Sequence, residues 1–384
     1  IELLEFLFSL AKSKNILFIN IFRPNFDQTG TRIRQYLKSE ISVLSKTIYL
    51  KTLDAEVSET LIHNLLDIKG LPYDIKDKMI NRAGGNPFFM EEIIRSLIDE
   101  GAIVIRNNQF QITDKIESIK IPSTINDLLT ARIDRLENNT KQLLKLASVI
   151  GRSFYYKIIT KIAENIQGID EQLLYLKDIQ LIRERTHLDE LEYIFKHTLA
   201  QEAAYNSILL EKRKQIHLQV AFSIETLFQD RINEFAGMLA MHYQKGEDHE
   251  KAEYYLEKAG EEALKTSGSN EALYYYKNAL DLYLAHTKNE VDPQKVASLE
   301  KNIAVALFYK GRFAESIEYF DKAMNFYDKS GSSFLSGTTI EFIANLSVFV
   351  AKLYFPYISW KRNPDKLNME YATLTIKKLS ALVS

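Results

Sequence analysis

The sequence contains no cysteine among its 384 residues. This absence excludes a disulfide framework, a zinc site built on thiolates and a cysteine nucleophile. An excess of one charge is also absent, because 49 basic and 51 acidic residues leave a formal net charge of −2. No overall field therefore favours nucleic acid or an anionic membrane surface, and partners must be selected by local surfaces.

A membrane span and a signal peptide are not visible either. The one suspicious apolar stretch, 342–358, is shorter than a bilayer span requires and contains Asn345, Lys352 and Pro356. We interpret it as a buried helix rather than a membrane contact. We therefore expect a cytoplasmic protein.

The phosphate-binding pattern GxxxxGK[ST] does not occur anywhere in the sequence. No strand that ends in paired acidic residues is present to hold Mg²⁺. We therefore expect that this chain neither hydrolyses ATP nor binds it tightly on its own. The chain begins at Ile1 with an amphipathic pattern over 1–10 that no capping residue precedes, so we expect it to be part of a longer protein.

The length and the 46% hydrophobic content allow several cores rather than one. Residues 14–24 form an apolar run that ends at Pro24, a pattern typical of a buried parallel strand. A second strand-like piece covers 48–53, and the polar stretch 25–34 between them has the composition of a loop or helix start. We predict that residues 1–53 hold the last strands of an α/β sheet.

Helices are predicted over 54–67, 72–83 and 88–101. The second and third are joined by Gly84-Gly85-Asn86-Pro87. The glycines suit a left-handed helix end and Pro87 suits the first turn of the following helix. We expect residues 54–119 to form a helical subdomain.

Residues 120–200 have the order of a winged helix. Helices are predicted at 123–136, 139–150, 155–164 and 170–178, and strands at 181–185 and 191–195 with a turn around 187–189. Arg132 and Arg135 are expected to form surface ion pairs with nearby acidic residues.

From 201 onward the pattern is helical and repeats internally. Residues 246–263 align with 311–327. Small, large and small residues recur at the same offsets, which lets paired helices approach closely in the manner of tetratricopeptide repeats. The three sets are Ala252, Leu256 and Ala259; Ala272, Tyr276 and Ala279; and Ser316, Phe320 and Ala323. A generic helical bundle is the alternative.

Four sequence blocks now suggest a family by their order and spacing. They are GNPFFMEEIIRSLIDEG, IPSTINDLLTARIDRLE, LLKLASVIGRSF and YIFKHTLAQEAAYNSILLEKRKQIH. The chain resembles the STAND ATPases over most of 1–330, and among them the large proteins that join such a module to an adenylate or guanylate cyclase. A looser resemblance is to ATPase modules fused to protein kinases or transcriptional activators.

The resemblance implies a mainly α fold in five parts. These are the distal strands and helices of an α/β P-loop ATPase domain (1–53), a helical lid (54–119), a winged-helix-like domain (120–200), tetratricopeptide-like repeats (201–331) and further helices (332–384). It also implies ATP or ADP as cofactor, with Mg²⁺ held by a P-loop domain upstream in the same chain. The cyclase domain's metal-binding aspartates are absent here.

The resemblance assigns five candidate site residues. Arg23 matches the Arg that senses the γ-phosphate, Gly85, Asn86 and Pro87 match the adenine-side turn, and His197 matches a position that touches the ADP phosphates in the resting state. Each has a plainer alternative: a solvent-exposed Arg at a strand end, a helix-to-helix turn without ligand, and a capping or packed His.

Three functions remain open from the sequence. The first is a regulatory switch in a nucleotide-gated signalling protein whose output is a cyclase. The second is a transcriptional regulator, which the acidic segment DEQLLYLKD at 170–178 disfavours because groove binding requires Lys and Arg. The third is a scaffold that binds protein partners through its repeats, with Tyr254, Tyr274, Tyr275 and Tyr319 as candidate contacts.

Overall fold

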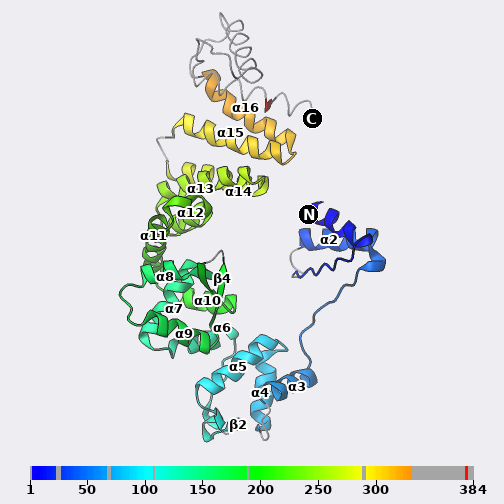
Figure 1. The fold of residues 1–384 in the computed structure, drawn as a ribbon, viewed down its shortest axis with the longest axis vertical. Helices are drawn as coiled ribbons and strands as arrows, with labels where there is room; N and C mark the ends of the chain where they lie inside the picture. Colours follow the sequence, from blue (N-terminus) through cyan, green and yellow to red (C-terminus); the bar gives the residue numbers. More distant parts are fainter. Residues whose placement is uncertain are drawn as a thin grey trace, which may run out of the picture. The chain divides into compact units, whose positions relative to one another are not determined.

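The computed structural model describes residues 2–22, 27–66, 71–106, 109–187, 190–287, 291–329 and 377–378. The chain divides into two compact units, Ile1–Ile121 and Pro122–Ser384, which we describe separately. Sixteen α-helices and five short strands make up the regular structure of the described residues. The prediction of a mainly α fold is confirmed (Figure 1).

The first unit begins with two helices, α1 (Glu2–Ser9) and α2 (Asp27–Glu40), followed by short 3₁₀ segments at Leu10–Lys12 and Ser42–Leu44. Phe8, Ile33 and Ile41 form a small core between them. The segment that follows α1 contacts this core through Phe18, whose ring makes an edge-to-face contact with Phe8.

The prediction of strands at 14–24 and 48–53 is wrong for the described residues. No strand is assigned in 2–22 or 45–54, and most of the apolar side chains expected to be buried lie in solvent, with Leu17 82% and Leu50 91% exposed. The physical reason is that a parallel strand needs hydrogen-bonding neighbours, and none pairs with these segments in the described part of the unit.

Helices α3 (Ala55–Leu66), α4 (Tyr73–Ala83) and α5 (Pro87–Asp99) confirm the three helices predicted here. A short antiparallel hairpin follows, β1 (Ile103–Arg106) and β2 (Gln109–Ile112), which the sequence did not suggest. The apolar face of α5 forms the core of this part, with the buried side chains Phe89, Met90, Ile93, Ile94 and Leu97.

The second unit opens with helices packed around a three-stranded antiparallel sheet. The elements are α6 (Ile125–Asp134), α7 (Asn138–Ile150), β3 (Ser153–Tyr155), α8 (Tyr156–Ile162), α9 (Ile169–Asp178), β4 (Ile182–His187) and β5 (Glu190–Phe195). The strand order is β3-β5-β4. The four helices and the β4–β5 hairpin match the prediction, whereas β3 was missed because it has only three residues.

A series of helices continues from this sheet. It comprises α10 (Thr198–Asn206), α11 (Leu210–Leu227), the 3₁₀ segment η4 (Gln229–Phe235), α12 (Ala236–Lys245), α13 (His249–Lys265), α14 (Ser269–His286), α15 (Pro293–Tyr309) and α16 (Phe313–Lys329). From α12 onward each helix packs against the next (Figure 1). This is the stacked arrangement that the internal repeat predicts.

The repeated small and large residues lie inside this stack. All nine members of the three sets are buried: Ala252, Leu256, Ala259, Ala272, Tyr276, Ala279, Ser316, Phe320 and Ala323. The approach of α13 and α14 is close, since a Cβ at Gly260 would lie 2.6 Å from Cε1 of Tyr276. The positions that repeat in the sequence therefore lie on the helix faces that pack against neighbouring helices.

Two predictions lie outside the described residues. Arg23 is one, and the other is the set of helices expected at 332–384, including the apolar stretch 342–358; only 377–378 of that region are described. Among the described helices, none combines the length and apolarity needed to span a bilayer.

Candidate functional site

The turn at 84–87 has the local geometry that the sequence predicts. Gly84 adopts a left-handed conformation, with φ of 55°, and its N–H donates to Ile80 O at 3.0 Å, which ends α4. Asn86 begins α5, because its side chain accepts hydrogen bonds from the backbone N–H groups of Phe88 and Phe89 at 3.0 and 3.3 Å. Pro87 occupies the first turn of α5 and is exposed.

Gly85 has a contact that the sequence could not reveal. Its carbonyl accepts a hydrogen bond from Leu53 N–H at 2.8 Å, and a Cβ at this position would lie 2.8 Å from Leu53 N and 3.0 Å from Thr52 Cβ. The chain that enters α3 therefore lies directly on this glycine. Gly85 is buried and both Gly85 and Asn86 make hydrogen bonds within the protein. Asn86 and Pro87 are also exposed to solvent at this turn.

His197 lies at the start of α10, directly after β5 and Lys196. Its side chain makes no capping hydrogen bond, its carbonyl accepts from Ala200 N–H at 3.1 Å, and the residue is half-buried. This site belongs to the second unit and the 84–87 turn belongs to the first. Their joint action on one nucleotide stays a prediction.

The expectation that Arg132 forms a surface ion pair is wrong. Arg132 is only 5% exposed, and its Nη2 donates to the backbone carbonyl of Ile179 at 3.2 Å. The cause is its position on the inner side of α6, beside the buried Leu128, Leu129 and Ile133. The side chain joins α6 to the residues that follow α9.

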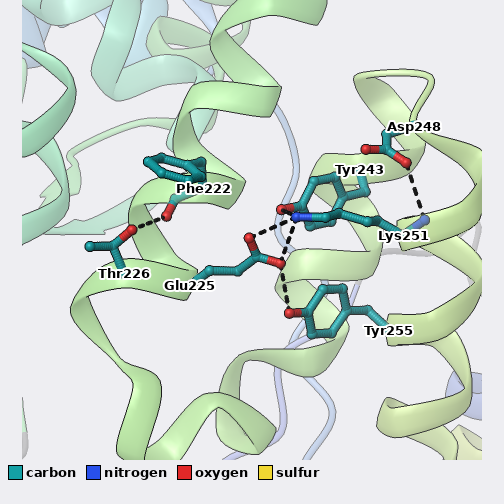
Figure 2. A network of polar contacts seen from close by, with 7 residues as sticks. All are labelled: Phe222, Glu225, Thr226, Tyr243, Asp248, Lys251 and Tyr255. Carbon is teal, nitrogen blue, oxygen red and sulfur yellow. Dashed lines mark hydrogen bonds and ion pairs between the residues drawn. The ribbon is translucent and has the colours of Figure 1, made fainter.

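Figure 2 shows a polar network that joins three helices of the second unit. Glu225 of α11 accepts hydrogen bonds from Lys251 Nζ at 2.9 Å and from Tyr255 Oη at 2.7 Å, both on α13. Lys251 also donates to Tyr243 Oη on α12 at 2.9 Å. The rings of Tyr243 and Tyr255 stack in nearly parallel planes, with centroids 5.7 Å apart. Asp248 caps α13 at its start.

Charge and burial oppose each other in this network. Partial burial acts to raise the pKa of Glu225, but hydrogen bonds from Lys251, Tyr243 and Tyr255 outweigh it, so the pKa is lowered overall. Burial, followed by the hydrogen bond to Glu225, raises the pKa of Tyr255. The carboxylate is therefore ionised and both phenols are neutral near pH 7, which suits a fixed structural contact rather than proton transfer.

A second polar group lies deeper, between α10, α11 and α12. His217 Nδ1 and His242 Nδ1 are 2.8 Å apart, and Tyr205 Oη lies 3.1 Å from His217 Nε2. Burial, with Lys245 and Arg213 nearby, lowers the pKa of His217 to about 4. Burial and then His217 lower the pKa of His242 to about 3. Both rings are thus neutral at pH 7, and one must donate while the other accepts.

The tyrosines predicted to contact protein partners divide into two groups. Tyr254 and Tyr274 are 53% and 64% exposed. Tyr275 packs on α12, because a Cβ at Gly237 would lie 2.5 Å from its Oη. Tyr319 is covered by Lys322 and Lys277, whose Nζ atoms lie 4.5 and 5.8 Å from the ring centroid. Of these four tyrosines, Tyr254 and Tyr274 offer open aromatic surface.

No cluster of three or more His, Asp or Glu side chains suited to a metal ion occurs among the described residues. The described side chains therefore identify no metal site of their own.

Three comparisons with known proteins each find a partial similarity to this chain. Residues 54–111, which cover α3 to β2, match a family described as a domain of unknown function (DUF8739). The chain is 22% identical over 250 residues to hybrid signal transduction histidine kinase G of Dictyostelium discoideum, a match that covers 53% of this chain and 7% of the kinase. The chain thus spans a small part of that relative.

Among solved structures, the chain is similar to a signal transduction ATPase with numerous domains and a tetratricopeptide repeat sensor from Pyrococcus horikoshii. The identity is 15%, the TM-score is 0.35, and the match covers 88% of this chain and 49% of that one.

Proposed function

We propose that this chain is a regulatory and protein-interaction module of a larger nucleotide-regulated signalling protein of the STAND type. The observation that carries the proposal is the helical stack α12–α16, in which three sets of small and large residues at matching offsets are all buried between neighbouring helices. Stacks of this kind present extended surfaces to other proteins. Tyr254 and Tyr274 are two exposed aromatic side chains through which such contacts would be made.

Residues 120–200 act in this proposal as a winged-helix element that couples nucleotide state to the stack. The order α7-β3-α8-α9-β4-β5 and the antiparallel sheet support this assignment. DNA binding is disfavoured, because α9 carries three acidic residues and a single cation, Lys177, which is paired with Glu184 at 2.5 Å. A contact with protein or nucleotide therefore fits this helix better.

The exposed segments 15–22 and 45–54 support the proposal that the first unit is completed by other residues of a larger protein. Ile19 and Ile21 are 77% and 89% exposed on one segment, and Ile48 and Leu50 are 72% and 91% exposed on the other. Apolar side chains exposed in this number favour a surface that another part of a protein covers. In the proposal a P-loop domain upstream in the same chain, which carries the Mg²⁺ site, covers them.

In the proposal, the 84–87 turn and His197 contact the nucleotide, and Arg23 senses its γ-phosphate. The exposed Asn86 and Pro87 at the start of α5 are available to an adenine ring, and a half-buried imidazole can donate to a phosphate. The output domain is a nucleotide cyclase by resemblance. The likeness to a histidine kinase makes a kinase the second candidate.

Calorimetric titration with ADP and with ATP tests the proposal. The 384-residue chain is compared with the same chain extended upstream by its own sequence of about one P-loop domain, roughly 150 residues. We expect binding only by the longer chain, and weaker binding when Pro87→Ala or His197→Ala is introduced. A control, Lys258→Ala, removes an exposed ion pair on α13 and should leave binding unchanged. If the longer chain binds neither nucleotide, the switch function is rejected and the scaffold function remains.

A further inference from the structure

The connection between α11 and α12 contains a helical segment of its own. It is the 3₁₀ segment η4 (Gln229–Phe235), and within it Arg231 leaves the helical conformation, with φ of −134° and ψ of 34°. A break between two helices is a place where their angle can change. The contacts of η4, beside those of α11 with α12 and α13, therefore influence the direction in which the stack continues.

Aromatic side chains hold the two ends of η4 against the sheet. Phe228 and Phe235 are 4% and 6% exposed and stack with their ring centroids 4.3 Å apart. Tyr155, on strand β3, contacts both rings at centroid distances of 6.0 Å. These contacts bring the base of the stack next to the strand that begins the sheet.

Arg231 adds a polar contact to the same place. Its guanidinium carbon lies 5.2 and 5.7 Å from the ring centroids of Phe228 and Phe235, within the range of cation–π attraction. Its Nη2 donates to Glu190 Oε1 on β5 at 2.7 Å. One side chain thus joins the break in the helix to the central strand of the sheet.

The charge of the Glu190 carboxylate is compensated mainly by Arg231. Its side chain is 15% exposed, and its Oε2 atom is buried and makes no hydrogen bond within the described residues. The other cation near Oε1 is Lys157 of α8, at 3.6 Å, whose side chain is 60% exposed. Glu192, the next residue on the same face of β5, is paired with Arg185 at 2.5 Å. Removing Arg231 would leave a largely buried carboxylate with one distant, hydrated partner, which is costly.

We infer that Arg231 is a positioning residue that holds η4 on β5 through Glu190. Together with the contacts of α11 with α12 and α13, this ion pair sets the angle between the α12–α16 stack and residues 122–227. When the ion pair opens, η4 leaves β5 and the angle of the stack changes within the range that the α11 contacts allow. The inference goes beyond the proposed function, since it holds whether or not the chain binds nucleotide. It gives the molecule a joint through which events at the sheet and at the stack influence each other.

Pulsed electron paramagnetic resonance tests the latch directly, because a chain without cysteine accepts spin labels at two introduced cysteines. Lys161→Cys on α8 and Lys265→Cys at the end of α13 place labels on exposed side chains on either side of η4. We expect a narrow distance distribution in the parent chain. Arg231→Ala and Glu190→Gln should broaden the distribution and shift its mean, and Arg231→Lys, which keeps the charge but not the planar fork, should lie between.

Hydrogen exchange provides the second measurement and separates the latch from general stability. In Arg231→Ala the amides of 229–235 should exchange about 10-fold to 100-fold faster, the range expected for loss of a charged hydrogen bond. Those of α13 and α14 should not change. The control Lys258→Ala loses the exposed Lys258–Glu261 pair and should change neither measurement.

Two results would overturn the inference. One is an unchanged distance distribution in both Arg231→Ala and Glu190→Gln at parental helix content. The other is faster exchange throughout α13 and α14, which would mean that the ion pair supports overall stability and not orientation. If Arg231→Ala fails to fold, Arg231→Lys and Glu190→Gln decide the outcome by the same criteria.

Discussion

Single residues fix the turn at 84–87 for different reasons. Gly84 and Gly85 both have left-handed backbone conformations, with φ of 55° and 73°. A Cβ at Gly84 would meet nothing within 4 Å, whereas one at Gly85 would press on the backbone of Leu53. The sequence predicted the left-handed turn, because Gly-Gly before Asn-Pro is typical of it. It could not predict the contact with Leu53, which lies far back along the chain.

These two glycines form a matched pair for mutation. Gly84→Ala should cost about 1 kcal/mol, the strain of a left-handed alanine. Gly85→Ala should cost about 2–4 kcal/mol, because the backbone of Leu53 must also move. Urea unfolding, followed by hydrogen exchange of α3 and α5, measures both. Equal costs would contradict the described contact between Gly85 and the chain that enters α3.

The buried pair of His217 and His242 makes the second unit sensitive to acid. In the folded chain the pKa values of these residues are about 4 and about 3, while an exposed histidine in the unfolded chain titrates near 6.5. Between pH 6.5 and 4 the unfolded chain therefore binds more protons than the folded chain, and stability falls as pH falls.

The expected loss between pH 6.5 and 4 is about 3 kcal/mol or more, at about 1.4 kcal/mol for each unit of pKa difference. The double variant His217→Phe and His242→Leu should show a much flatter dependence over this range, since no buried imidazole remains to be protonated. Urea unfolding at half-unit pH steps measures both curves. Parallel curves for parent and variant would show that other groups cause the acid sensitivity.

At the scale of elements, periodicity predicted the helices and the β4–β5 hairpin well, but the two strands expected in the first unit poorly. The apolar spacing over 88–101 and the repeated offsets around Ala252, Ala272 and Ser316 mark faces that are buried in the structure. Apolar alternation at 15–22 and 48–53 also predicted burial, yet these side chains are exposed. A helix satisfies its own backbone, whereas a strand depends on neighbours that the sequence of the segment cannot supply.

The Glu225 network joins elements that lie 26 residues apart in sequence, so no local pattern could predict it. Lys251→Met removes the ammonium and keeps the apolar stem, and it should lower stability by about 1 kcal/mol, because Lys251 is partly exposed and Tyr255 still donates to Glu225. Lys258→Met removes an exposed ion pair with Glu261 and a contact with the exposed Tyr254 ring on the same helix, and it should stay within about 0.5 kcal/mol. Thermal unfolding compares them, and equal effects would mean that the network contributes no more than a surface pair.

For the whole molecule, the sequence predicted the mainly α fold and the internal repeat. The candidate nucleotide residues were placed by resemblance, and they belong to two separate units, with Gly85, Asn86 and Pro87 in the first and His197 in the second. The joint at Arg231 and Glu190 was not predicted, because the two residues are separated by 41 positions and meet only through the packing of η4 on the sheet.

Hydrogen exchange of the upstream-extended chain, with and without ADP, measures the proposed nucleotide contacts of the 84–87 turn and of His197 separately. We expect slower exchange on adding ADP in two segments: the amides of 84–90 at the start of α5 and those of 196–200 at the start of α10. His197→Ala should abolish the second protection and weaken the first. Protection confined to the upstream domain, with both of these segments unchanged, would contradict the account.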